Sequence, residues 1–172
     1  MPMRRQAGFT LIELIACIVI LGLIGIGAAT VISLGTRSFF SARNADNAGV
    51  SAQIALERIS LELRDIDSTK AAGAVKVKTD GTSMIYATSQ TALPGTRTLA
   101  FNGGAITLAV DTGAGGTART LIGGVHTCTM SYSGTGRSTS LTVTFTLTDA
   151  PKGEVFTTTV KPRSNTLDPV PY

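Results

Sequence analysis

Glu13 is the ionisable residue whose position in the sequence most clearly predicts an interaction with a cation. It lies near the start of an apolar segment, because residues 14–29 carry no charged or strongly polar side chain. A helix of roughly 20 mostly apolar residues spans a bilayer core, so this segment is long enough to do so. A carboxylate at the centre of such a helix costs on the order of 2.5–3.5 kcal/mol. Glu13 therefore either lies solvated at headgroup depth or needs a cation, and the same span contains none.

The residues before this segment form a short basic leader that ends in glycine. Arg4 and Arg5 precede Gly8, and Phe9 opens the sequence Phe-Thr-Leu-Ile-Glu. This arrangement resembles the prepilin signal of type IV pilins and type II secretion pseudopilins, although that family usually has Lys or Arg in place of the alanine before Gly8. The resemblance implies that prepilin peptidase cuts between Gly8 and Phe9 and methylates the new amino terminus. Glu13 then becomes the fifth mature residue.

An ordinary secretory signal is the competing interpretation of the same segment. Such signals are cleaved after the apolar stretch, beside small residues such as Ala28 and Ala29. An acid inside the apolar region would be unusual there, so the sequence favours the prepilin interpretation. The paired arginines before the span orient the leader to the cytoplasm. We therefore expect a single-pass inner-membrane protein with its head outside the cytoplasm, and later a periplasmic or extracellular filament.

The later chain offers little that would support catalysis or metal binding. Alternation places His126, Cys128, Met130 and Tyr132 on one face of a strand, which is typical of an apolar core. A Cys–His nucleophile pair would also need close approach and a third, orienting group. Asp111 lies in a glycine-rich loop, but calcium needs six to eight oxygens and several carboxylates. We expect no enzyme activity, no metal and no cofactor.

The two cysteines are not expected to form a disulfide. Cys17 lies within the apolar span and Cys128 lies deep in the soluble part of the chain. A zinc site needs a cluster of nitrogen or sulfur ligands, and the chain has a single histidine.

Composition bounds the class of the soluble part. The 172 residues leave room for one modest domain beyond the span. The net charge of +4 is spread thinly, since Arg4 and Arg5 are the longest basic run, so no nucleic-acid binding by the chain itself is expected. Abundant Thr, Gly and Ser without Trp are common in extracellular β-rich domains.

A helix is predicted to continue beyond the span to about Ile66. Apolar residues recur there at spacings of three and four, on one helix face: Ala52, Leu56, Ile59, Leu63 and Ile66. Arg58 and Glu62 are expected to pair on the solvated side. Residues 9–35 would form the transmembrane half of this spine helix and residues 36–68 its amphipathic half.

Four glycines interrupt the first half of the spine: Gly22, Gly25, Gly27 and Gly35. Each costs about 1 kcal/mol relative to alanine in a helix interior. They either allow close helix–helix packing in a membrane or let the segment unwind when subunits pack, and both interpretations remain open.

From residue 69 to 172 the pattern predicts a β-rich head with a flexible tail from Asn165. Residues 99–101 lead through Asn102-Gly103-Gly104 into 106–110, which predicts a hairpin. Residues 141–147 alternate apolar side chains with threonine, and a turn at 149–153 leads into 154–161. One antiparallel sheet should pack its apolar face on the helix stripe. The fold expected is α+β: the pilin-like long helix with a β-sheet head.

These expectations favour a structural subunit of a type IV pilus or a type II secretion pseudopilus. Partners would be prepilin peptidase, other pilin or pseudopilin subunits, the inner-membrane assembly platform and membrane lipid. The sequence at 56–63, the two-hairpin β region and the ending Val160-Lys161-Pro162-Arg163 resemble J-class minor pseudopilins. The large head and the missing cysteine pair favour a minor subunit. The alternative is a membrane-anchored extracytoplasmic binding module, either an adhesin or a substrate receptor.

Overall fold

The computed structural model describes residues 9–67, 75–88, 95–111, 116–136, 138–151, 153–163 and 169–172. The leader, including Gly8, lies outside the described residues. The chain divides into two compact units, Met1–Arg43 and Asn44–Tyr172, and each is described by itself. One long apolar helix is followed by a β-sheet head, which is the α+β, pilin-like fold expected from the sequence.

The described part of the first unit consists of the helix α1 (Leu11–Arg64) up to Arg43 and the two residues before it. Its large apolar side chains are exposed on every side. Two of its hydroxyls bond their own helix: Thr30 Oγ1 donates to the Ile26 carbonyl at 2.9 Å and Thr36 Oγ1 to the Ile32 carbonyl at 2.8 Å. These bonds satisfy the polar groups locally and leave an apolar surface. By length and composition, α1 is able to cross a membrane.

The second unit begins with the rest of α1, whose inner face is lined by small and branched apolar residues. The fully buried ones are Ala52, Ala55, Ile59 and Leu63. The predicted stripe is confirmed here, except that α1 ends at Arg64 and Ile66 forms an isolated β-bridge with Thr88.

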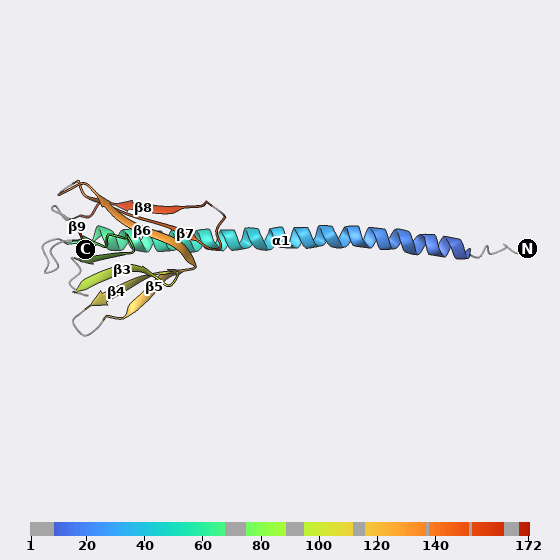
Figure 1. Ribbon diagram of the computed structural model, residues 1–172, viewed down its shortest axis with the longest axis horizontal. Helices are drawn as coiled ribbons and strands as arrows, with labels where there is room; N and C mark the ends of the chain where they lie inside the picture. The colour runs from blue at the N-terminus through green and yellow to red at the C-terminus, as the bar shows by residue number, and fades with distance from the viewer. Residues whose placement is uncertain are drawn as a thin grey trace, which may run out of the picture. The chain divides into compact units, whose positions relative to one another are not determined.

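The second unit contains nine strands in two sheets among the described residues (Figure 1). The six-stranded sheet has the order β5-β4-β3-β2-β1-β9 and the three-stranded sheet the order β6-β7-β8. The strands are β1 (Lys76–Val77), β2 (Ser83–Ala87), β3 (Thr96–Asn102), β4 (Ala105–Asp111), β5 (Ala118–Gly123), β6 (Val125–Ser133), β7 (Ser140–Leu147), β8 (Phe156–Val160) and β9 (Val170–Pro171).

The predicted hairpin with a glycine turn is confirmed as β3 and β4. Asn102 pairs with Ala105, so the loop has two residues. Its residues Gly103 and Gly104 have φ values of 58° and 77°. A two-residue turn with both φ values positive fits the right-handed twist of the strands, and glycine adopts it without steric cost.

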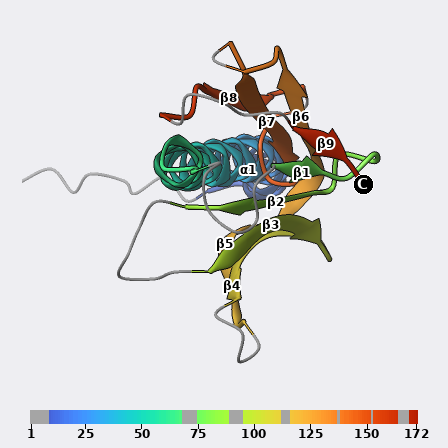
Figure 2. The ribbon, with the colours of Figure 1, turned by 90° about the vertical axis from the view of Figure 1, so that its left-hand side faces the viewer.

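The head contains two sheets, so the prediction of one sheet is wrong. The chain passes from the first sheet to the second at Gly124, which has a φ of 68°. The Val125 N–H donates to the Gly104 carbonyl at 2.8 Å, and the Thr148 N–H donates to the Gly124 carbonyl at 2.8 Å. This left-handed residue turns β6 away from β5. Figure 2 shows α1 with β2 and β3 on one side and β7 and β8 on the other, and all of them share one core.

The prediction that Glu62 pairs with Arg58 on the solvated side of the helix is wrong. Its side chain is 22% exposed and forms an ion pair with Arg97 of β3, which is 2% exposed. Tyr86 of β2 is the register partner of Arg97 and is buried beside this pair. Burial raises the pKa of the Tyr86 phenol, and the nearby Glu62 carboxylate adds to the effect. The helix thus meets the larger sheet through a buried ionic contact as well as through apolar packing.

The end of the chain adds a strand to the larger sheet. Residues 165–168 of the expected flexible tail lie outside the described residues, but β9 pairs in parallel with β1. The Val170 N–H donates to the Val75 carbonyl at 2.9 Å and the Tyr172 N–H to the Val77 carbonyl at 3.2 Å. Residues 170–172 therefore cover an edge of β1 that would otherwise expose unpaired backbone groups.

Candidate functional site

Of the residues predicted for processing and assembly, Phe9 and Glu13 lie at the start of α1, and Gly8 lies outside the described residues. Phe9 precedes the helix and its side chain is 78% exposed. The carbonyl of Thr10 accepts the first helical bonds, from the N–H of Glu13 at 3.1 Å and of Leu14 at 3.2 Å. Glu13 thereby lies in the first turn, where the positive end of the helix dipole favours a carboxylate. The site is an exposed aromatic residue followed within one turn by an acid.

Within the described part of the first unit, no cation lies near Glu13. The basic residues there are Arg37 and Arg43. Arg37, the nearer of them, is 24 residues further along the helix, about 36 Å at about 1.5 Å per residue. Neither of these two arginines is therefore within reach of the Glu13 carboxylate.

Comparison with known proteins identifies this segment. Residues 3–29 match the family model of the prokaryotic N-terminal methylation motif. The chain carries the type IV pilin and pseudopilin signal. No curated protein and no solved structure matched the chain.

The pilin signal indicates the role of the segment that contains Phe9 and Glu13. The matched residues include Gly8, Phe9 and Glu13. The signal implies processing by prepilin peptidase and assembly with other pilin subunits. Together with the apolar helix, it indicates membrane anchoring.

The prediction that His126 and Cys128 lie on the same face of a strand is wrong. The register of β6 against β7 shifts between Val125 and Thr127, so His126 is the extra residue of a β-bulge and is exposed. Cys128 is buried, and burial raises the pKa of its thiol to about 11. The structure does not bring an imidazole to this thiol, which stays protonated at neutral pH.

The remaining candidates for metal binding are not gathered by the fold. Asp111 is the last residue of β4, and the loop that follows it, 112–115, lies outside the described residues. Across the part of the chain that the structure describes, no three His, Cys, Asp or Glu side chains form a metal-binding group. Cys17 and Cys128 are free, the former exposed and the latter buried.

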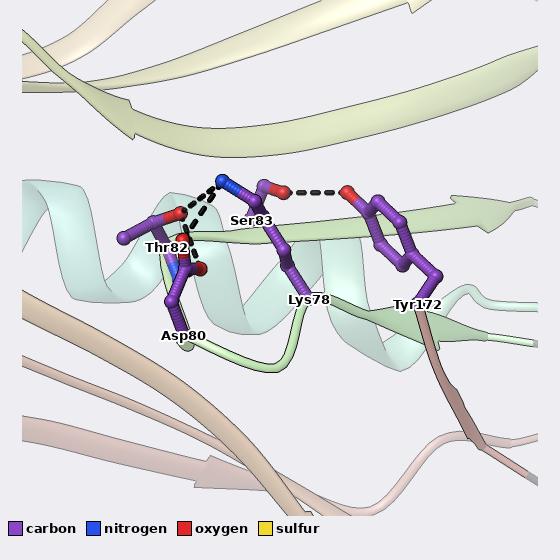
Figure 3. Close-up of polar contacts among 5 residues, drawn as sticks. All are labelled: Lys78, Asp80, Thr82, Ser83 and Tyr172. Carbon is purple, nitrogen blue, oxygen red and sulfur yellow. Dashed lines mark hydrogen bonds and ion pairs between the residues drawn. The ribbon is translucent and has the colours of Figure 1, made fainter.

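Sequence reasoning missed a polar cluster at the turn between β1 and β2 (Figure 3). Lys78 Nζ lies 2.8 Å from Asp80 Oδ2. Thr82 donates to Asp80 Oδ1 through its N–H at 2.9 Å and through its hydroxyl at 2.6 Å. The hydroxyls of Ser83 and Tyr172 are 2.5 Å apart. The sequence Asp80-Gly81 between two apolar runs is a turn signal that would have located the cluster.

This cluster also links the two sheets. The carbonyl of Gly81, at the tip of the turn, accepts the Met130 N–H of β6 at 2.8 Å. The Tyr172 carbonyl accepts the Thr79 N–H at 3.2 Å. The turn is thus held by its own side chains, by the end of the chain and by the second sheet.

Asp80 should titrate at a lower pH than an ordinary aspartate. Its hydrogen bonds with Lys78 and then with Thr82 lower its pKa from 3.8 to about 2. Because the folded pKa is the lower one, these bonds stabilise the turn fully above the ordinary value, and the stabilisation is lost as the pH falls through about 2. The chemical shift of the Thr82 amide in an NMR titration should have its midpoint near 2.

The control for this titration is Asp80→Asn, in which the Thr82 amide should not titrate in the same range. A wild-type midpoint close to 3.8 would contradict the geometry of the turn.

Proposed function

We propose that the protein is a minor pilin or pseudopilin, a structural subunit of a type IV pilus or a type II secretion pseudopilus. Prepilin peptidase processes it, and its N-terminal helix carries assembly. The observation that supports this function best is the pilin signal at residues 3–29, directly before a helix with apolar side chains exposed on all sides. Such a surface needs lipid or other helices around it. The β-sheet head then remains in water.

The proposed pathway begins in the inner membrane. Arg4 and Arg5 hold the leader on the cytoplasmic side, so the head lies outside the cytoplasm. The assembly platform of the inner membrane then adds the subunit to a periplasmic or extracellular filament. The resemblance of the later chain to J-class pseudopilins remains a prediction within this proposal.

In this proposal the protein works without catalysis. The protonated Cys128 thiol and the exposed His126 give no support for a nucleophile. The function rests on surfaces that pack and on one charge, that of Glu13.

Glu13 is proposed to act on a neighbouring subunit. Cleavage after Gly8 creates a free amine on Phe9, and methylation leaves it cationic. The amine of an incoming subunit lies at nearly the same depth in the membrane as Glu13 of the subunit before it. Pairing the two offsets the cost of holding each charge in hydrocarbon and fixes the axial register of addition.

The mature protein should begin at Phe9 and carry one methyl group on its amine. The reason is the geometry of the signal, in which Gly8 gives the peptidase access without a side chain. Intact mass of the protein extracted from membranes measures both changes. A product that begins after Ala29 would instead show an ordinary signal peptide, and the filament function would then be wrong.

The protein should be less abundant in its filament than the principal subunit. Its head is large relative to its helix, and it lacks the cysteine pair that closes a surface loop in many major pilins. Quantitative mass spectrometry of purified filaments measures the ratio. If this chain is the most abundant subunit, the minor assignment is wrong, whereas the proposed role of Glu13 is unaffected.

A further inference from the structure

The first unit ends in a cluster of two arginines and two phenylalanines that the proposed function does not use. We call Arg37, Phe39, Phe40 and Arg43 the collar. After Glu13 no charged residue occurs before Arg37, and no acid occurs before Asp46. Four of the seven residues from 37 to 43 are therefore cationic or aromatic, directly after an apolar segment.

The length of the helix gives the depth of the collar in a membrane. Arg37 is 26 residues after Leu11, which is about 39 Å along the helix axis. A bilayer is about 40–45 Å thick including its headgroups, with a hydrocarbon core of about 30 Å. If Leu11 lies at the cytoplasmic edge of the hydrocarbon core, so that Glu13 lies just inside it as proposed above, Arg37 lies about 9 Å beyond the opposite edge, at the outer side of the headgroups. This inference rests on the proposed function in that respect.

The side chains of the collar are exposed. Phe39 is 65% exposed and Phe40 55% exposed, and their rings lie 6.0 Å apart at an angle of 69°. Arg37 and Phe40 are three residues apart and Phe39 and Arg43 four, so each arginine shares a helix face with one ring. The two faces lie about 110° apart, since each residue turns the helix by about 100°. The collar therefore presents both cations and both rings on one side of the helix.

The charges of the collar select the partner. Both arginine side chains are exposed, and among the described residues none of the ion pairs involves them. A guanidinium binds a phosphate through two parallel hydrogen bonds, and aromatic rings lie favourably at the boundary between hydrocarbon and headgroups. We propose that the collar binds the phosphodiester headgroups of anionic lipid on the side of the membrane where the head lies.

Lipid that stays with the purified protein tests this proposal. The full chain is inserted into vesicles of phosphatidylcholine mixed with phosphatidylglycerol and extracted in mild detergent, and the bound lipid is quantified by mass spectrometry. An arginine near an anionic surface contributes about fivefold in affinity. We therefore expect phosphatidylglycerol to be enriched severalfold over its share of the vesicles. The variant Arg37→Gln with Arg43→Gln should lose this enrichment.

The matched control is Arg58→Gln with Arg119→Gln, which removes the same charge from two exposed positions of the second unit. It should retain the enrichment. Equal enrichment in the wild type and the collar variant, or equal loss in the control, would overturn the proposal. Loss of the bound lipid on adding millimolar inorganic phosphate would also overturn it, because a lipid held at the bilayer surface is not displaced by dilute free phosphate.

Intact mass of the protein extracted from its native membranes, measured beside the lipid test, separates this inference from the proposed function. Intact mass reports whether cleavage occurred after Gly8, and the lipid measurement does not depend on cleavage. Correct cleavage without lipid selectivity refutes the collar alone. Lipid selectivity without cleavage refutes the filament function and leaves the collar.

Discussion

Filaments assembled in the presence of Glu13→Gln should contain severalfold less of the variant than of the wild-type subunit. Glutamine keeps the shape of the side chain but removes its charge, so the amine of the incoming Phe9 would remain unpaired near the edge of the hydrocarbon. The cost of a charge is on the order of 2.5–3.5 kcal/mol at the centre of a helix and falls to about 1 kcal/mol near the membrane surface, and each 1.4 kcal/mol is a factor of about ten. Co-purification with sheared filaments measures the incorporation.

Processing and insertion of Glu13→Gln should be normal, because the cleavage site precedes Glu13 and the apolar span is unchanged. The matched control is Glu57→Gln, which removes an exposed charge from the same helix within the second unit. It should enter filaments at the wild-type level. Normal incorporation of Glu13→Gln would show that the proposed pairing with Phe9 is dispensable.

Glu62→Leu should destabilise the head by about 3–5 kcal/mol. The variant leaves the guanidinium of Arg97 buried without its carboxylate, and a buried charge that loses its partner is strongly destabilising. Arg97→Met should cost less, about 1–3 kcal/mol, because Glu62 is 22% exposed and can regain water. The order of the two effects follows from the difference in burial.

The double variant Glu62→Leu with Arg97→Met should return to within about 1 kcal/mol of the wild type, since apolar residues of similar volume often replace a buried pair without loss. Urea unfolding of the full chain in detergent measures all three variants. Tyrosine emission can follow it, because the chain has three tyrosines and no tryptophan. As a control, Arg58→Gln at an exposed position should change the free energy of unfolding by no more than about 0.5 kcal/mol. A double variant as unstable as Glu62→Leu would contradict the pairing.

Local signals in the sequence predicted the parts of the fold that depend on neighbouring residues. The apolar run before Arg37 predicted the helix, and Asn102-Gly103-Gly104 predicted a turn whose two central residues need positive φ values. The division of the head into two sheets was not predictable, because alternation within a strand does not say which strand lies beside it. That division depends on Gly124, one glycine among nineteen in the sequence.

The candidate site was predictable for a related reason. Gly8, Phe9 and Glu13 form a linear signal within six residues, so no knowledge of the fold was needed to place them together. By contrast, the contact of Glu62 with Arg97 joins residues 35 positions apart in the sequence. Helix periodicity does not contain such a contact, and it therefore placed Glu62 on the solvent-exposed side of the helix. β9 has two residues, one of them proline. A strand this short has no alternation of apolar and polar residues from which it could be predicted. The bulge that turns His126 outward likewise leaves no mark on the alternation of β6.

The even distribution of apolar side chains around the first part of α1 has a thermodynamic consequence. Seventeen large apolar residues between Phe9 and Phe40 are exposed, and transferring each to water costs about 1.5–3 kcal/mol. A subunit pulled from lipid into water would therefore lose on the order of tens of kcal/mol before it met a partner. In the proposed filament, removal from the bilayer and addition to the growing polymer would then proceed as one coupled event, in which contacts between helices replace contacts with lipid. A pairwise complex would shield only one side, so each helix requires neighbours on all sides.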